Sequence, residues 1–162
     1  NGQFVLKGGE LLTPKTISIT PVTNFDVDPD VDPLALGSYL YFPFNRGRFT
    51  GFREYSVNST TDNYDSSDIT EQVPNYIPAN INSISGTTTE DIIAVTTDNE
   101  PSSLFVYKYF WSGVNKVLSS WSKFTLQGNI IGMSFIEANL YVLFTLNNQT
   151  HLVLLPKTYN FS

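Results

Sequence analysis

The sequence contains no cysteine and only one histidine among its 162 residues. Without cysteine, the chain can form neither a disulfide bond nor a thiolate metal site. A single histidine, His151, also excludes metal sites that need several imidazole ligands. His151 begins an apolar run, and the sequence contains no motif for a nucleophile that it could activate. We therefore expect a histidine near the end of a surface strand rather than a general base.

Charge is also scarce, because charged residues make up 15% of the chain, with a net charge of −6. The nine lysines and arginines are scattered, and only Arg46 and Arg48 lie close together. Gripping DNA through its phosphates needs clustered positive charge, so no DNA-gripping module is expected. An acidic surface that DNA passes without binding fits this charge, as does ordinary acidic solubility. The low charge predicts either a surface of Ser, Thr and Asn or one partly covered by other segments or chains.

Long apolar runs and targeting segments are missing as well. No run approaches the roughly 18 residues of a membrane-spanning helix, and no signal peptide is visible, so we expect no membrane insertion by this segment. No phosphate-binding glycine loop, G-x-S-x-G motif or sialidase aspartate box occurs, so neither a cofactor nor an enzyme is indicated. The chain starts at Asn1 and its only methionine is Met133, which leads us to expect a portion of a longer protein.

Aromatic residues are abundant, at 14% of the chain. Together with many Thr, Ile and Val, they favour an all-β fold, which we expect as a single domain over residues 1–162. The richest stretch, Leu104 to Leu126, predicts a β-hairpin with its turn at Ser112–Asn115. In its second strand we expect Trp121 and Val117 to face the core.

The same signals predict further strands between turns rich in Gly, Pro, Asn and Asp. They lie at Gln3–Lys7, Thr16–Val22, Ser38–Asn45, Phe49–Val57, Ile81–Ser85, Ile92–Thr96, Asn129–Ile136, Asn139–Leu146 and His151–Leu155. Pro43 predicts an edge position or a bulge. Residues 58–67 are expected to form an exposed loop, and Asp68–Val73 one helical turn with Asp68 as its N-cap. Asn147 and Asn148 are expected to form a hairpin turn.

Three segments repeat one pattern of a short strand, an apolar strand and a third apolar or aromatic strand, separated by turns. The copies span residues 34–57, 83–111 and 134–159. Their central strands start near Tyr39, Ile92 and Leu140, which gives spacings of 53 and 48 residues. Repeats of about 40–50 residues with several strands each suggest antiparallel β-propeller blades. Because three or so blades cannot close a ring, we predict an incomplete β-propeller within a larger chain, with a β-sandwich as the alternative.

Four aspartates alternate along one loop, at Asp26, Asp28, Asp30 and Asp32. Alternate carboxylates can converge on Ca²⁺, but the glycine and the closing glutamate of an EF-hand loop are absent. The sequence leaves open whether this loop binds a cation or is a solvated acidic turn.

Acidic residues in other loops, Asp91, Asp98, Glu100 and Glu137, are candidates for glycan chemistry. Hydrolysis would need two of these carboxylates held a few ångströms apart, which the sequence cannot place. Exposed aromatic rings beside such carboxylates could instead form a platform for a sugar. A glycan-binding or glycan-hydrolysing propeller module of a tail or other β-rich assembly is therefore the alternative function.

Short motifs in a fixed order carry a resemblance to a known family. They are Gln3–Leu6 and Leu12–Pro14; Leu40–Phe42, Arg46–Gly47, Phe49–Thr50 and Glu54–Tyr55; Asp68–Thr70, Val73–Pro74 and Tyr76–Pro78; and Val106–Tyr109 and Ser120–Lys123. In this order and spacing the chain resembles the tail nozzle, or tail tubular protein B, family of short-tailed bacteriophages (podoviruses). The resemblance covers nearly the whole chain, but family members are several times longer, which implies an interior or carboxyl-side portion.

The resemblance implies a structural virion protein of the phage tail, made in the host cytoplasm and without catalytic residues. Six copies are expected to form the distal tail tube, which retains the genome and conducts DNA during ejection. The implied partners are other copies in a hexameric ring, the tail adaptor protein, tail fibres as a further candidate, and passing DNA without sequence-specific binding. The body would be propeller-like, with these aromatic residues in the blade cores: Phe105, Tyr107, Tyr109, Trp121, Tyr141 and Phe144.

Overall fold

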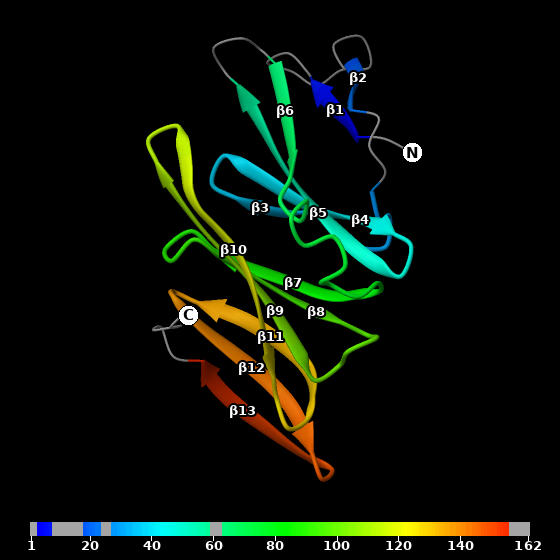
Figure 1. Cartoon of the computed structure of the whole chain (residues 1–162), viewed down its shortest axis with the longest axis vertical. Coiled ribbons are helices and arrows are strands. Elements are labelled where there is room, and N and C mark those ends of the chain that lie inside the picture. Colours follow the sequence, from blue (N-terminus) through cyan, green and yellow to red (C-terminus); the bar gives the residue numbers. More distant parts are fainter. Residues whose placement is uncertain (1–2, 8–17, 24–26, 59–62, 156–162) are drawn as a thin grey trace.

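The computed structural model describes residues 3–7, 18–23, 27–58 and 63–155, and this part of the chain is all-β (Figure 1). The strands are β1 (Gln3–Lys7), β2 (Ser18–Thr23), β3 (Leu34–Leu36), β4 (Tyr39–Arg46), β5 (Phe49–Asn58), β6 (Asn63–Asp68), β7 (Ile81–Thr87), β8 (Ile92–Thr97), β9 (Ser103–Ser112), β10 (Asn115–Thr125), β11 (Asn129–Ile136), β12 (Asn139–Leu146) and β13 (Gln149–Leu155). The described residues include no helix with the length and hydropathy of a membrane span.

Neighbours in each sheet are also neighbours in the sequence, and all pairs are antiparallel. β1 and β2 form a hairpin. Strands β3–β6 form a four-stranded meander (the first sheet), β7–β10 a second (the middle sheet), and β11–β13 a three-stranded one (the third sheet). The three repeat copies coincide with β3–β5, β7–β9 and β11–β13, so the predicted repeat is confirmed as a structural unit.

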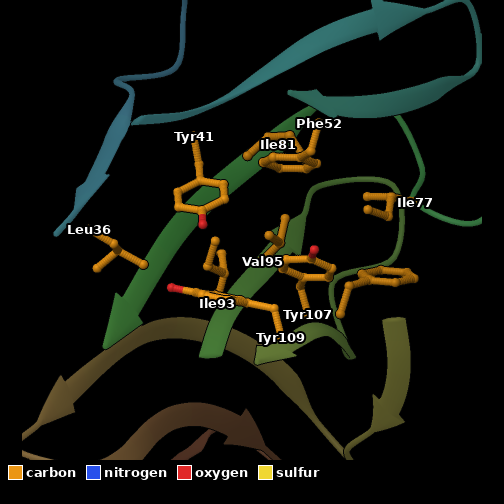
Figure 2. Packing of buried hydrophobic residues seen from close by; sticks show 10 residues of the cluster. Leu36, Tyr41, Phe52, Ile77, Ile81, Ile93, Val95, Tyr107 and Tyr109 are labelled. Atoms are coloured by element: carbon orange, nitrogen blue, oxygen red, sulfur yellow. The ribbon is translucent and has the colours of Figure 1, made fainter. Parts of the chain in front are cut away.

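The three meanders pack in chain order, with the middle sheet between the other two (Figure 1). Figure 2 shows the contact with the first sheet, where Tyr41 and Phe52 face Ile93, Val95 and Tyr107. The opposite face of the middle sheet, with Ile92, Ala94, Leu104 and Val106, packs on Leu140 and Val142 of the third sheet. Alternate side chains of a strand point to opposite faces of its sheet. Since both faces of the middle sheet are covered, every residue of β8 is buried.

Two expectations between β5 and β7 were wrong. Asn63–Asp68 forms a strand, β6, rather than a loop, because the edge of β5 offers backbone partners that do not depend on apolar side chains. Asp68–Val73 forms turns instead of a helical turn. Asp68 Oδ1 accepts hydrogen bonds from the backbone N–H of Thr70 at 2.8 Å and from its hydroxyl at 2.7 Å. Pro74 disfavours helical geometry at the residue before it.

β4 contains a proline, and β10 contains a bulge. β4 lies between β3 and β5, and its ladder with β5 shows no bulge, so the expectation of an edge strand or a bulge at Pro43 was wrong. The sheet tolerates the proline because β3 pairs with β4 only as far as Tyr41. The Pro43 carbonyl accepts a hydrogen bond from the Asp28 N–H at 3.0 Å. In β10 the register shifts between Lys116 and Leu118, and Val117 is 61% exposed. The expectation that Val117 faces the core was therefore wrong.

The hairpin turns fit their sequences. Asn147 and Asn148 have φ of 52° and 60°, as the predicted two-residue turn requires. The β9–β10 turn has φ of 62° at Gly113. These two turn predictions are confirmed.

Most of the aromatic residues that were expected in a core are buried or packed against one. Phe105, Tyr107 and Tyr109 are buried, and Trp121 packs against them. Tyr141 is an exception, since it lies on the face of β12 opposite to Leu140 and Val142 and is only half-buried. Phe144 is also half-buried.

Candidate functional site

The four candidate carboxylates have separate local roles and line neither of the two pockets described below. Asp91 and Glu137 occupy turn positions with φ of 53° and 57°. Asp98 accepts a hydrogen bond from the Asn82 amide at 2.7 Å. Glu100 forms an ion pair with Lys123, whose hydrogen bond lowers the pKa of the Glu100 carboxyl.

The aspartate loop and the histidine also lack a constellation for chemistry. Asp28 Oδ1 accepts a hydrogen bond from the Asp30 N–H at 3.1 Å, which closes a local turn, while Asp26 lies outside the described residues. Within the described ranges, no group of three or more His, Asp or Glu residues is placed to hold a metal ion. His151 lies exposed in β13, with its ring stacked on Phe144 at 5.4 Å, so the expected surface histidine is confirmed.

A buried ion pair between the first and middle sheets is the feature that the sequence did not reveal. Lys116 Nζ donates to Glu54 Oε2 at 2.7 Å and to the Tyr107 hydroxyl at 3.2 Å. The Tyr41 hydroxyl donates to the same Glu54 oxygen at 2.8 Å. Glu54 is 5% exposed, so these donors replace the water that its carboxylate would otherwise bind.

Three aromatic rings surround the lysine end of this pair. Lys116 Nζ lies 5.7 Å from the ring centroid of Tyr107, 5.8 Å from that of Tyr109 and 4.9 Å from that of Trp111. At such distances the ring faces attract a cation. Trp111 in turn stacks on Tyr39 at 5.3 Å between ring centroids. The hairpin β9–β10 is thus joined to the first sheet by both charge and aromatic contact.

Burial keeps the tyrosines of this cluster protonated. Burial raises the pKa of Tyr41, and the charge of Glu54 raises it further. Burial also raises the pKa of Tyr107, and it raises that of Tyr109 to about 12. These hydroxyls therefore stay protonated above the usual tyrosine pKa of about 10, and that of Tyr41 remains a donor to the buried Glu54 carboxylate.

Glu54 carried a signal in the sequence, whereas Lys116 did not. In β5, Phe52 and Glu54 are two residues apart and therefore lie on the same face of the strand. Because Phe52 faces the core, Glu54 must face it as well, and a carboxylate in that position needs a buried partner. Lys116 faces inward beside a bulge, and a bulge changes which residues of a strand point to the core.

A pocket of about 430 Å³ opens beside this ion pair, between the end of β6 and strand β10. One wall includes Ser67, Asp68, Glu71 and Gln72, and the other includes Lys116, Ser119, Ser120 and Trp121. A second pocket of about 290 Å³ shares Ser67 and extends toward Trp111 and the hairpin tip. The arrangement offers hydroxyls, an amide and an indole to a ligand, but no nucleophile activated by a base.

Comparisons with known proteins give one consistent result. A family model described as "Bacteriophage nozzle protein" matches residues 1–161. The chain is 32% identical over 161 residues to the tail tubular protein gp12 of Escherichia phage T7. This match covers 98% of the chain and 20% of the relative, so the chain spans about a fifth of that protein's length.

Proposed function

Because this chain belongs to the bacteriophage nozzle protein family, we propose that it is a structural module of the tail nozzle of a short-tailed phage. The observation that carries the proposal is the family match, which spans residues 1–161 rather than one motif. The identity to a tail tubular protein supports a place in the virion tail. The role proposed is structural and not enzymatic, in keeping with the local structural use of the candidate carboxylates.

We further propose that the three larger sheets are blades of a β-propeller. Three meanders that pack in chain order, with the middle one covered on both faces, support blades more than a two-sheet sandwich. The outer face of the third sheet supports further blades. Leu143 and Leu152 are cross-strand neighbours there, and Leu152 is 66% exposed. Blades outside this chain would cover that face and close the ring.

In the whole protein, we propose that six copies form the distal tail tube, which retains the genome and later conducts it out. The net charge of −6 supports passage of DNA, because an acidic wall does not bind phosphates. The proposed partners are the other copies, the tail adaptor protein and, on the outside, tail fibres.

Immunogold electron microscopy tests this function. An antibody raised against residues 63–155 would be applied to intact phage particles from the same source, with an antibody to the major capsid protein as the control. We expect label at the distal end of the tail. Capsid label together with a bare but accessible tail would overturn the nozzle assignment.

A further inference from the structure

The pocket between β6 and β10 has the size of a small ligand site and a mainly polar lining. Its volume of about 430 Å³ falls within the range of small-molecule sites, about 300–1,000 Å³. It lies where the edge strands of two sheets meet, since β6 ends the first sheet and β10 ends the middle sheet. The structural role proposed above gives this pocket no task.

Internal pairing cancels most of the charge in the pocket walls. Asp68 forms an ion pair with Arg46, and Lys116 forms one with Glu54. Glu71 is the remaining charged lining residue, and it is exposed. A phosphate or a cation would therefore find little uncompensated charge, whereas a neutral ligand that forms hydrogen bonds would meet no such obstacle.

Polar groups with unused hydrogen-bonding capacity line the same walls. The side chains of Gln72 and Ser120 form no hydrogen bond within the described ranges, and both line the pocket. An amide and a hydroxyl both donate and accept, which matches the hydroxyl groups of a sugar. Such groups specify a ligand's orientation in a pocket.

An indole held in one orientation supplies the apolar part of the wall. Trp121 Nε1 donates to the Ile69 carbonyl at 3.0 Å. Its ring lies 5.5 Å from that of Phe52 and 5.0 Å from that of Tyr107, between centroids. A fixed ring loses little conformational entropy when a ligand packs against it.

We propose that this pocket binds a neutral oligosaccharide. A saccharide combines many hydroxyl groups with apolar C–H faces, and the pocket combines unpaired polar side chains with an indole wall. A peptide added as an extra strand fits less well, because the bulge at Val117 interrupts the regular backbone spacing of the β10 edge beside the pocket. This inference is independent of the structural role in the nozzle.

The test is saturation-transfer difference NMR with the full-length protein. The probes are neutral hexasaccharides of α-1,4-linked glucose, β-1,4-linked glucose and β-1,4-linked N-acetylglucosamine, with an uncharged six-residue serine–alanine peptide as the competing class. We expect saturation transfer to at least one hexasaccharide, and unchanged affinity when salt is raised. Gln72→Ala and Ser120→Ala should each weaken that binding by about 2–10-fold, since each removes one hydrogen bond.

Ser134→Ala is the matched control, because Ser134 is exposed on the third sheet and lines neither pocket. It should leave saccharide binding unchanged, and thermal unfolding would verify that all three variants fold. No transfer to any hexasaccharide, transfer to the peptide alone, or saccharide binding that neither pocket variant weakens would each overturn the proposal. None of these results would alter the immunogold label on the tail, so the two proposals fail separately.

Discussion

At the scale of single residues, Glu54 and Lys116 form the most deeply buried of the three ion pairs found among the described residues. Burying a carboxylate is unfavourable unless donors replace its water, and Lys116 and Tyr41 supply them. Because Glu54 belongs to β5 and Lys116 to β10, the pair also fixes how the hairpin lies against the first sheet.

Lys116→Met should therefore destabilise the protein strongly. It keeps much of the aliphatic stem but leaves Glu54 buried without its cation, which costs about 3–5 kcal/mol. Denaturant unfolding measures the loss. Lys123→Met is the matched control, since the Lys123–Glu100 pair is more than a third exposed and such pairs contribute about 0–1 kcal/mol. Equal losses in the two variants would contradict a special role for Lys116.

Trp121→Ala should cost about 3–5 kcal/mol in unfolding free energy. The ring packs against Phe52 and Tyr107, and its N–H satisfies the Ile69 carbonyl. Trp121→Phe should lose less, because it retains an aromatic ring but not the hydrogen bond. If the alanine variant unfolded within about 0.5 kcal/mol of the parent, Trp121 would not be part of the core.

Asp91→Asn should stabilise the protein at neutral pH. Burial, and then the charge of Glu90, raise the pKa of Asp91, so the folded state holds this proton more tightly than the unfolded state. The contribution of Asp91 to the free energy of unfolding is thus fully present below its usual pKa of about 3.9. That contribution is lost as the pH rises through the pKa that Asp91 has in the folded state. Asparagine stays neutral and tolerates the φ of 53°.

The measurement for Asp91→Asn is the melting temperature from pH 3 to pH 7. The variant should melt above the parent at pH 7 and together with it at the acidic end. A gain of the same size at both ends would mean that the charge of Asp91 is not its cause.

Residue positions could be predicted where a strand keeps its regular alternation. Phe105, Tyr107 and Trp121 were placed correctly because apolar residues in such a run face a core. The inward Lys116 and outward Val117 could not be predicted, because a bulge changes the alternation without a sequence mark of its own.

At the scale of elements, apolar content decided which strands the sequence could reveal. β11 and β12 were predicted with their observed ends. β6 was missed, since Asn63–Asp68 contains few apolar residues and owes its extended form to pairing with β5. β3 was predicted only as the short strand that opens the first repeat copy, because its three residues are too few to show an alternation of their own. Both strands are extended because they pair with a neighbouring strand, and the sequence of a strand does not show its partner.

Gly128→Ala should disrupt the connection between the middle and third sheets. A Cβ at Gly128 would lie 2.1 Å from the Thr145 carbonyl oxygen, so the backbone must shift, at a cost of about 1–3 kcal/mol. Gly132→Ala is the control in the neighbouring strand, where a Cβ meets nothing within 4 Å. Thermal unfolding compares the two. Equal melting temperatures would show that the Gly128 segment can move freely.

At the scale of the whole molecule, the middle sheet depends on its two neighbours. One face of the middle sheet packs on the first sheet and the other on the third. Losing either neighbour would therefore expose apolar residues of β8 and β9. The division into three successive sheets could be predicted from the repeat, since each copy contains three consecutive strands of one sheet. Whether the proposed blades belong to a closed ring could not be predicted, because three sheets cannot make the contacts of a closed ring among themselves.

Alkaline titration should show the packing of the first sheet on the middle one. Tyr41, Tyr107 and Tyr109 lie between these sheets, and burial raises their pKa values, that of Tyr109 to about 12. Stability from these tyrosines is therefore present below their usual pKa of about 10 and is lost as pH rises through the folded values.

Ultraviolet absorbance of tyrosinate, followed together with circular dichroism, measures this effect. A first group of tyrosines should ionise near pH 10, and the buried group only as the sheets separate. In denaturant, all nine tyrosines should ionise together near pH 10. A single transition near pH 10 with an unchanged dichroism spectrum would contradict the burial.

Pairing between consecutive strands has a kinetic consequence. Every ladder in the described chain joins a strand to the next one along the sequence, so each sheet closes over short stretches of polypeptide. Such pairing keeps the contact order below that of a sheet whose strands pair across long connections, which favours faster folding. During synthesis the first sheet can form before the middle sheet has left the ribosome, and each later sheet can then pack on one that is already folded.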